Sequence, residues 1–387
     1  MPEGLTITLE GRTRLAVPSA SLTAAAPATS PVFYNPAAGT NRDVSVAVAE
    51  GAGGGSFCDA MAGVGARGVR IAVEARSVRQ VTLVDFNRAA LRVATRSARL
   101  NRVSGKCKVV ESESAAFLVS RFGRDERYDF VDVDPFGTPA RYLQGAVSAT
   151  SDGGLVSLTA TDTAALCGVY PKVCLRRYGA RPMNNHFSHE TGIRVLLMAL
   201  ARAAASQDAG ISPVVSHSTK HYIRVYARIE RGASRADASL SSAGFVASCS
   251  SCGWTWLEEG VPRECPTCGA RASCAGPLWA RGLTDNTVLR KSLRAARKLG
   301  LASASKTLGP LTDVDHFPPW SFRVDDACSA LGAATVPKWR VVALLEARGF
   351  RCGDQPFEKD GVKTDATYDE FSSAVKESLA SASLSQK

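Results

Sequence analysis

The sequence predicts an α/β fold with a mostly parallel sheet, followed by a smaller C-terminal α+β domain. Short apolar runs alternate with helix-length segments between residues 56 and 231, a polar stretch follows near residue 235, and paired cysteines lie beyond it. Strands that alternate with helices form parallel sheets with both faces covered. We therefore expect a first domain over 1–235, with an N-terminal extension over 1–55, and a second domain over 236–387.

Seven apolar runs are the expected strands of the first domain. Five of them alternate with helical segments, and two more follow a helix expected over 189–205. Because no helix separates the last two runs, they must pair antiparallel. This closure is typical of the Rossmann-like sheet of class I methyltransferases. The runs are GSFCDAM, VTLVDF, CKVVES, YDFVDVD, GGLVSLTAT, ISPVVSHST and HYIRVYARIE.

The segments that flank the first domain have simpler patterns. Alternating residues from Leu5 to Leu15 predict a hairpin. The Ala-, Ser- and Pro-rich stretch over 18–31 and the polar stretch GASRADASLSSAG over 232–244 are both interpreted as loose connectors.

The charge balance favours a polyanionic partner. The 387 residues include 47 Lys and Arg against 36 Asp and Glu, a net charge of +11, and such an excess attracts phosphate backbones. The N-terminus lacks a signal-peptide pattern, and no apolar run reaches the roughly eighteen residues of a membrane helix. We expect a soluble, cytoplasmic protein without membrane contact, and no obligate protein partner is evident.

A glycine-rich turn indicates a nucleoside-containing ligand. Gly63, Gly65 and Gly68 follow the first apolar run and open a helix, so the backbone can approach a ligand closely. Asp85 ends the next run, 22 positions after Gly63, where a carboxylate can accept hydrogen bonds from both ribose hydroxyls. NAD and S-adenosylmethionine would both be served by these residues.

Two charged residues favour S-adenosylmethionine over NAD. Asp59, at the end of the first run, can take the cationic amino group of the methionine moiety, whereas a pyrophosphate would gain nothing from that negative charge. Arg67, at the start of the following helix, can pair with the methionine carboxylate. Glu113 or Ser114, after the third run, is expected to receive the adenine amino group.

The loop Asp134-Pro135-Phe136-Gly137 follows the fourth strand, at the edge of the sheet where ligands bind. It resembles the [DNS]-P-P-[YF] loop of amino-group methyltransferases. Asp134 and the carbonyl of Pro135 can accept hydrogen bonds from an exocyclic amine, and Phe136 offers a face on which a base can stack. We expect apolar neighbours to raise the pKa of Asp134 and make it a better base. The alternative is an Asp-capped turn.

Two C-x-x-C pairs in the second domain predict a structural zinc site. Twelve residues separate the pairs, and a glycine follows each, a spacing suited to four thiolates around tetrahedral zinc. Cys274 is a further thiol that could compete as a ligand. The basic run LRKSLRAARKLG over 289–300 is either a solvated helix face or an RNA-backbone contact. The expected zinc ligands are Cys249, Cys252, Cys265 and Cys268.

Several stretches together resemble one family, the tRNA guanine-26 N2-dimethyltransferases of archaea and eukaryotes. The resemblance implies transfer of one or two methyl groups from S-adenosylmethionine to N2 of guanine-26 in tRNA. It further implies that Arg42 reaches the cofactor and that Phe33 faces Phe136 to sandwich a flipped base. Glu113 departs from the Asp more common in the family. The matching stretches are VFYNPAAGTNRDVSV, DAMAGVGARGVR, DVDPFGTP, HYIRVYARIERG, CAGPLWARGL and DGVKTDA.

Other functions remain open from the residues alone. The amine chemistry of the D-P-F-G loop also suits an N2-guanine or N6-adenine methyltransferase acting on rRNA or DNA. From a different class, the chain could be an inactive zinc-ribbon RNA-binding protein, although the intact Asp59, Asp85 and Asp134 argue against that. An NAD enzyme is the weakest alternative.

Overall fold

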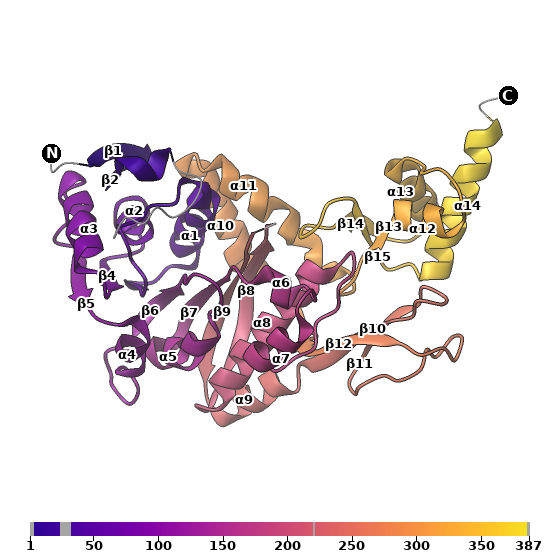
Figure 1. Ribbon diagram of the computed structural model, residues 1–387, viewed down its shortest axis with the longest axis horizontal. Coiled ribbons are helices and arrows are strands. Elements are labelled where there is room, and N and C mark those ends of the chain that lie inside the picture. The colour runs from indigo at the N-terminus through magenta and orange to yellow at the C-terminus, as the bar shows by residue number, and fades with distance from the viewer. Residues whose placement is uncertain (1–3, 24–31, 220, 385–387) are drawn as a thin grey trace.

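A seven-stranded sheet forms the centre of the computed structural model, which describes residues 4–23, 32–219 and 221–384 (Figure 1). The strand order is β5-β4-β3-β6-β7-β9-β8, and β9 pairs antiparallel with both β7 and β8 while the other neighbours are parallel. The predicted Rossmann-like sheet with an antiparallel closure is confirmed. Its strands are β3 Ser56–Asp59, β4 Gln80–Asp85, β5 Cys107–Glu111, β6 Tyr128–Val133, β7 Thr150–Ala160, β8 Ala209–Ser218 and β9 Ile223–Arg231.

Helices cover both faces of this sheet (Figure 1). One layer contains α1 Gly39–Ala52, α2 Ala66–Glu74 and α3 Arg88–Leu100, and the other contains α4 Ser114–Val119, α5 Leu143–Ala149 and α8 Ser188–Ala205. Helix α3 shows why these segments are helical. The Asn87 side chain caps its first turn, and Leu91, Ala94 and Ala98 recur at helical spacing on its buried face. Two short helices, α6 Thr163–Leu166 and α7 Pro171–Tyr178, lie beside α8.

The N-terminal hairpin is confirmed. Strands β1 Leu5–Glu10 and β2 Thr13–Pro18 pair antiparallel, and β2 packs on α2 and α3. The predicted connector after it begins with a short 3-10 turn, η1 Ser19–Leu22, while residues 24–31 lie outside the described residues. A second 3-10 turn, η2 Pro36–Ala38, leads into α1.

The loose connector predicted over 232–244 is wrong. Residues Ala233–Leu240 form helix α9, which packs on α8 and β8. Small side chains let the helix lie close to the sheet, and the Ser239 hydroxyl accepts a 2.8 Å hydrogen bond from the backbone N–H of Ile211. Because Ser239 makes a hydrogen bond to the strand backbone, this face of α9 packs on the sheet without large apolar side chains.

The C-terminal elements form two groups. In the first, a sheet of order β11-β10-β12 is followed by helices α10 and α11, which pack on α1. In the second, a sheet of order β13-β15-β14 and three helices surround a separate apolar core. The elements are β10 Ala243–Ser248, β11 Thr255–Glu258, β12 Ser273–Trp279, α10 Asn286–Leu299, α11 Ala302–Leu308, η4 Gly309–His316, β13 Phe322–Arg323, α12 Val324–Ala330, α13 Lys338–Ala347, β14 Cys352–Asp354, β15 Gly361–Thr364 and α14 Tyr368–Leu384.

Helix α10 thus shares one apolar core with the methyltransferase-type sheet. Leu289, Leu293 and Ala296 of α10 belong to the same buried cluster as Val44 and Val48 of α1. Within the described ranges, no helix is both long and apolar enough to span a membrane.

Helices α1 and α10 approach each other closely at Gly51. A Cβ atom built there would lie 2.5 Å from the backbone nitrogen of Ser292. We expect Gly51→Val to separate the two helices and to lower the free energy of unfolding by about 1–3 kcal/mol, measured by urea denaturation. Gly39→Ala is the control, because a Cβ atom at Gly39 meets nothing within 4 Å. Equal stability of the two variants would contradict this packing.

Candidate active site and metal centre

The glycine turn between β3 and α2 has the open geometry that the sequence predicted. Gly63 and Gly65 adopt φ values of 49° and 75°, which favour glycine. A Cβ atom at Gly63 would meet nothing within 4 Å, so the space above it is open, whereas one at Gly68 would lie 2.2 Å from Leu83. The first two glycines therefore shape the turn, and the third lets α2 pack against the sheet.

Two predicted carboxylates border this turn at the ends of adjacent parallel strands. Asp59 ends β3 and is buried, and its Oδ2 accepts a 2.9 Å hydrogen bond from the backbone N–H of Gly68. Burial and the nearby Asp132 raise the pKa of Asp59 to about 7. Asp85 ends β4 and accepts 2.8 Å hydrogen bonds from the backbone N–H groups of Gly63 and Asn87. Both carboxylates are therefore held in place by the backbone.

Glu113 and Ser114 take structural partners at the start of α4. The buried Ser114 hydroxyl donates a 2.6 Å hydrogen bond to the carbonyl of Ala60. The exposed Glu113 side chain accepts a 2.8 Å hydrogen bond from the backbone N–H of Ala116 and caps the helix. Ser114 thus supports the loop after β3, and the expected adenine contact stays a prediction.

The D-P-F-G loop leaves β6 and is fastened to the segment after β7. Gly137 has φ 77°, its N–H donates to the Thr161 hydroxyl over 2.7 Å, and its carbonyl accepts from the Thr161 N–H over 2.8 Å. Pro135 is buried, whereas Phe136 is 81% exposed. The loop therefore presents an unburied aromatic ring on a fixed backbone.

Phe33 and Phe136 lie next to each other although 103 positions separate them in the sequence. Their ring centroids are 6.3 Å apart and the ring planes are inclined by 46°. A base stacked between two parallel rings needs about 7 Å between the ring planes. The rings consequently have to rotate and separate slightly before they can enclose a base.

Arg67 joins the glycine turn to the D-P-F-G loop. Its buried guanidinium pairs with Asp132 over 2.9 Å, pairs with Asp134, and donates to the Asn41 side chain over 2.8 Å. On the far side of Asp132, the fully buried Arg224 of β9 forms a second ion pair. Two arginines and two aspartates therefore form one charge network beneath the site.

The expectation that apolar neighbours make Asp134 more basic is wrong. Burial acts to raise its pKa, but the guanidinium groups of Arg67 and Arg224 outweigh it and hold the pKa below the ordinary value. The Asp134 side chain stays partly accessible, at 28% exposure. Asp134 is thus an ionised hydrogen-bond acceptor, well suited to holding an amine N–H.

Sequence reasoning missed Asp132 and Arg224 as members of the site. Asp132 is part of the D-V-D-P-F-G stretch, and two carboxylates so close in a buried strand need cations. Arg224 interrupts the apolar run Y-I-R-V-Y, which is the signal that could have revealed a buried, paired cation.

Arg42 is held behind the Phe33 segment by the N-terminal hairpin. Its Nε donates to Glu10 over 2.6 Å, its Nη2 donates to the carbonyl of Asn35 over 2.9 Å, and its guanidinium lies 5.0 Å from the Tyr34 ring centre. Burial acts to raise the pKa of Glu10, but Arg42 and Arg70 lower it to about 2. The hairpin thereby fixes the segment that presents Phe33.

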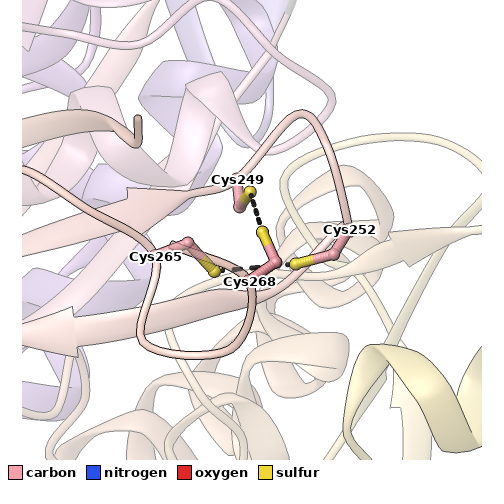
Figure 2. A group of neighbouring side chains, drawn as sticks. All are labelled: Cys249, Cys252, Cys265 and Cys268. Carbon is pink, nitrogen blue, oxygen red and sulfur yellow. Dashed lines mark hydrogen bonds between the residues drawn. The ribbon is translucent and has the colours of Figure 1, made fainter. Parts of the chain in front are cut away.

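The four predicted zinc ligands converge in the first C-terminal group (Figure 2). Their sulfur atoms all lie within 4.8 Å of one another, and two of the sulfur pairs are 3.6 Å apart. Tetrahedral zinc with Zn–S bonds of about 2.3 Å requires sulfur atoms about 3.8 Å apart. Gly253 and Gly269 have φ values of 75° and 71°, as the turn after each pair requires. The cluster fits a structural zinc site.

Comparisons with known proteins agree with this geometry. The model of the N2,N2-dimethylguanosine tRNA methyltransferase family matches residues 11–376. The chain is 37% identical over 368 residues to the tRNA (guanine(26)-N(2))-dimethyltransferase of Methanothermobacter thermautotrophicus, covering 92% of this chain and 95% of that protein. The enzyme of the same name from Methanopyrus kandleri is also 37% identical, with coverages of 96% and 97%.

A solved structure is similar over nearly its whole length. It is the complex of Trm1 from Pyrococcus horikoshii with S-adenosyl-L-methionine, which matches with a TM-score of 0.84 and 28% sequence identity. The match covers 96% of this chain and 99% of that one.

We expect the purified chain to hold one zinc ion through the four cysteines. Cys249→Ser should lose the metal and lower the midpoint of thermal unfolding, because the metal crosslinks two loops, as measured by elemental analysis and calorimetry. Cys274→Ser is the matched control, since its sulfur lies outside the four-sulfur cluster. Retention of a full equivalent of zinc by Cys249→Ser would contradict the site.

Proposed function

This chain belongs to the N2,N2-dimethylguanosine tRNA methyltransferase family, and from that premise we propose how its own residues carry out the reaction. The protein is an S-adenosylmethionine-dependent enzyme that methylates N2 of guanine-26 in tRNA. The observation that carries the proposed site is the position of Asp134, beside two aromatic rings and linked through Arg67 to the glycine turn.

The cofactor lies, in this proposal, over the turn formed by Gly63 and Gly65. Asp85 accepts hydrogen bonds from the ribose hydroxyls, and Asp59 pairs with the amino group of the methionine moiety, since an ammonium favours the ionised form of this buried carboxyl. The lone pairs left by the backbone contacts of both carboxylates are available for this purpose. The other proposed cofactor residues already have partners within the protein, so each has to exchange a partner to contact the cofactor; they are Arg42, Arg67, Glu113 and Ser114.

The guanine is bound at the D-P-F-G loop. Asp134 and the carbonyl of Pro135 accept hydrogen bonds from the exocyclic amine, which returns electron density to a nitrogen whose lone pair is otherwise delocalised. Phe33 and Phe136 enclose the ring after it leaves its stack. Because the two rings are now 6.3 Å apart and tilted, binding of the base has to move at least one of them.

Bound S-adenosylmethionine supplies an electrophilic methyl group, and the protein supplies position and charge. Arg67 keeps Asp134 ionised and aimed, so the carboxylate is ready to accept hydrogen bonds before transfer. Methylation turns the conjugated amine into a strongly acidic ammonium group. A carboxylate of lowered pKa is sufficient to accept that proton, and a raised pKa is not needed.

We also propose the substrate, the roles of the two parts of the chain and the cellular location on the basis of the family. The substrate is tRNA, with residues 1–235 carrying the reaction and residues 236–387 completing the fold, holding zinc and contributing to tRNA recognition. We place the enzyme in the cytoplasm, where the eleven cysteines stay reduced. In support, the four clustered cysteines fit zinc, which binds reduced thiolates.

The decisive test of the function uses tRNA transcripts that carry G or A at position 26. The protein and labelled S-adenosylmethionine should yield N2-methylated guanosine with the first transcript and no label at that position with the second. Nucleoside analysis by mass spectrometry identifies the product. Equal labelling of both transcripts would remove the assignment to guanine-26.

Asp134→Ala should abolish methyl transfer, with kcat lowered by about 100-fold or more, because the amine loses its acceptor. Binding of S-adenosylmethionine, measured by calorimetry, should change little. Asp129→Ala is a control, because this carboxylate lies at the opposite end of β6 and accepts bonds from Gly55 and Ser56. An Asp134→Ala enzyme with full activity would show that another group accepts the amine hydrogens.

A further inference from the structure

Helices α3 and α10 each carry at least four cations and no acidic residue. Helix α3 contains Arg88, Arg92, Arg96 and Arg99, and α10 contains Arg290, Lys291, Arg294, Arg297 and Lys298. Several of these cations are four residues apart, at positions that face each other on a helix, where like charges repel and destabilise the helix. Such an arrangement is unfavourable for an isolated fold and becomes favourable when an anion lies across it.

Nearly all of these cations lack a partner within the part of the chain that the structure describes. Arg88 lies 3.5 Å from Glu111. The side chains of Arg92, Arg96, Arg99 and the five cations of α10 form no ion pair or hydrogen bond with the described residues. Seven of those eight cations are exposed, and Arg96 is half-buried. They are therefore available to bind phosphate groups.

The N-terminal hairpin joins the two helices into one surface. Arg14 donates to the carbonyl of Leu100 at the end of α3 over 2.9 Å, and Arg12 donates to the carbonyl of Lys298 near the end of α10 over 3.0 Å. Figure 1 shows the hairpin between α3 and the α10–α11 pair. The exposed Arg12 and Arg14 thus bridge the gap between the helices. We name this surface the basic band.

The rest of the C-terminal part has the opposite charge. Residues 236–285 and 300–387 together hold 13 Lys and Arg against 17 Asp and Glu. The net charge of +11 therefore comes from the first 235 residues and from α10. A polyanion is therefore attracted to residues 1–235 and to α10, and not to the remainder of residues 236–387.

We propose that the basic band holds the phosphate backbone of the tRNA while guanine-26 enters the site, an inference that rests on the proposed function. The band adjoins the site at two points. Helix α3 begins three residues after Asp85, and Glu10 of the hairpin holds Arg42 behind Phe33. A nucleic acid strand lying along α3 therefore reaches the edge of the sheet where Asp85 and the glycine turn lie. The band fixes the register of the tRNA, and the D-P-F-G loop selects the amine.

Two triple variants test the band. Arg92→Gln/Arg96→Gln/Arg99→Gln neutralises α3, and Arg290→Gln/Arg294→Gln/Arg297→Gln neutralises α10. The matched control, Arg340→Gln/Lys359→Gln/Lys376→Gln, removes the same charge from the second C-terminal group. The dissociation constant for an unmodified tRNA transcript is measured by filter binding at several salt concentrations, together with kcat at saturating tRNA and the affinity for S-adenosylmethionine.

Each band variant should raise the Kd for tRNA about 10-fold or more and lower the slope of log Kd against log salt by about 2–3, as expected for three lost phosphate contacts. The control variant should keep the Kd for tRNA of the unmodified protein. In all three variants, kcat at saturating tRNA and the affinity for S-adenosylmethionine should stay unchanged. Unchanged tRNA binding by both band variants, with methylation intact, would contradict the proposal that the basic band binds tRNA and would not affect the proposed function. A DNA duplex bound as tightly as tRNA would overturn the assignment to tRNA. Loss of tRNA binding in the band variants, without methylation of guanine-26 by the unmodified protein, would instead support the band and overturn the function.

Discussion

The ion pair between Arg67 and Asp134 is the interaction on which the rest of the site depends. Arg67 lies in the first turn of α2, directly after the glycine turn, and Asp134 is the first residue of the loop that follows β6. The pair therefore couples the cofactor side to the acceptor side through a single guanidinium. Asp132 and Arg224 anchor it from below and keep the charges of the network balanced. Burial of these charges is tolerated only because each has a partner.

A second constraint comes from the hairpin that precedes the sheet. Glu10 contacts Arg42, Arg70 and the Tyr34 hydroxyl, so an N-terminal extension of the fold positions the aromatic wall of the pocket. The same hairpin reaches the carboxyl ends of α3 and α10. One small element thus links the segment that presents Phe33 to the basic band, which explains how a segment outside the central sheet affects its chemistry.

Local patterns sufficed to predict the strands, the antiparallel closure, the hairpin and the convergence of four cysteines, because each follows from apolar periodicity or ligand spacing. The α9 helix escaped prediction because its partner is the backbone of β8, and such a partner leaves no apolar pattern in the sequence. The lowered pKa of Asp134 escaped for a related reason. Its causes are Arg67, which the sequence pairs with the cofactor carboxylate, and Arg224, which lies 90 positions away within an expected strand.

The packing of α10 against α1 has a consequence for how the chain is made. The outer layer of the catalytic sheet is completed by a helix that is translated more than 230 residues after α1. Until α10 has left the ribosome, the face of α1 around Gly51 has no covering partner. The nascent enzyme therefore reaches its working form only late in synthesis, and a polypeptide cut at the apparent domain boundary would leave apolar side chains open to aggregation.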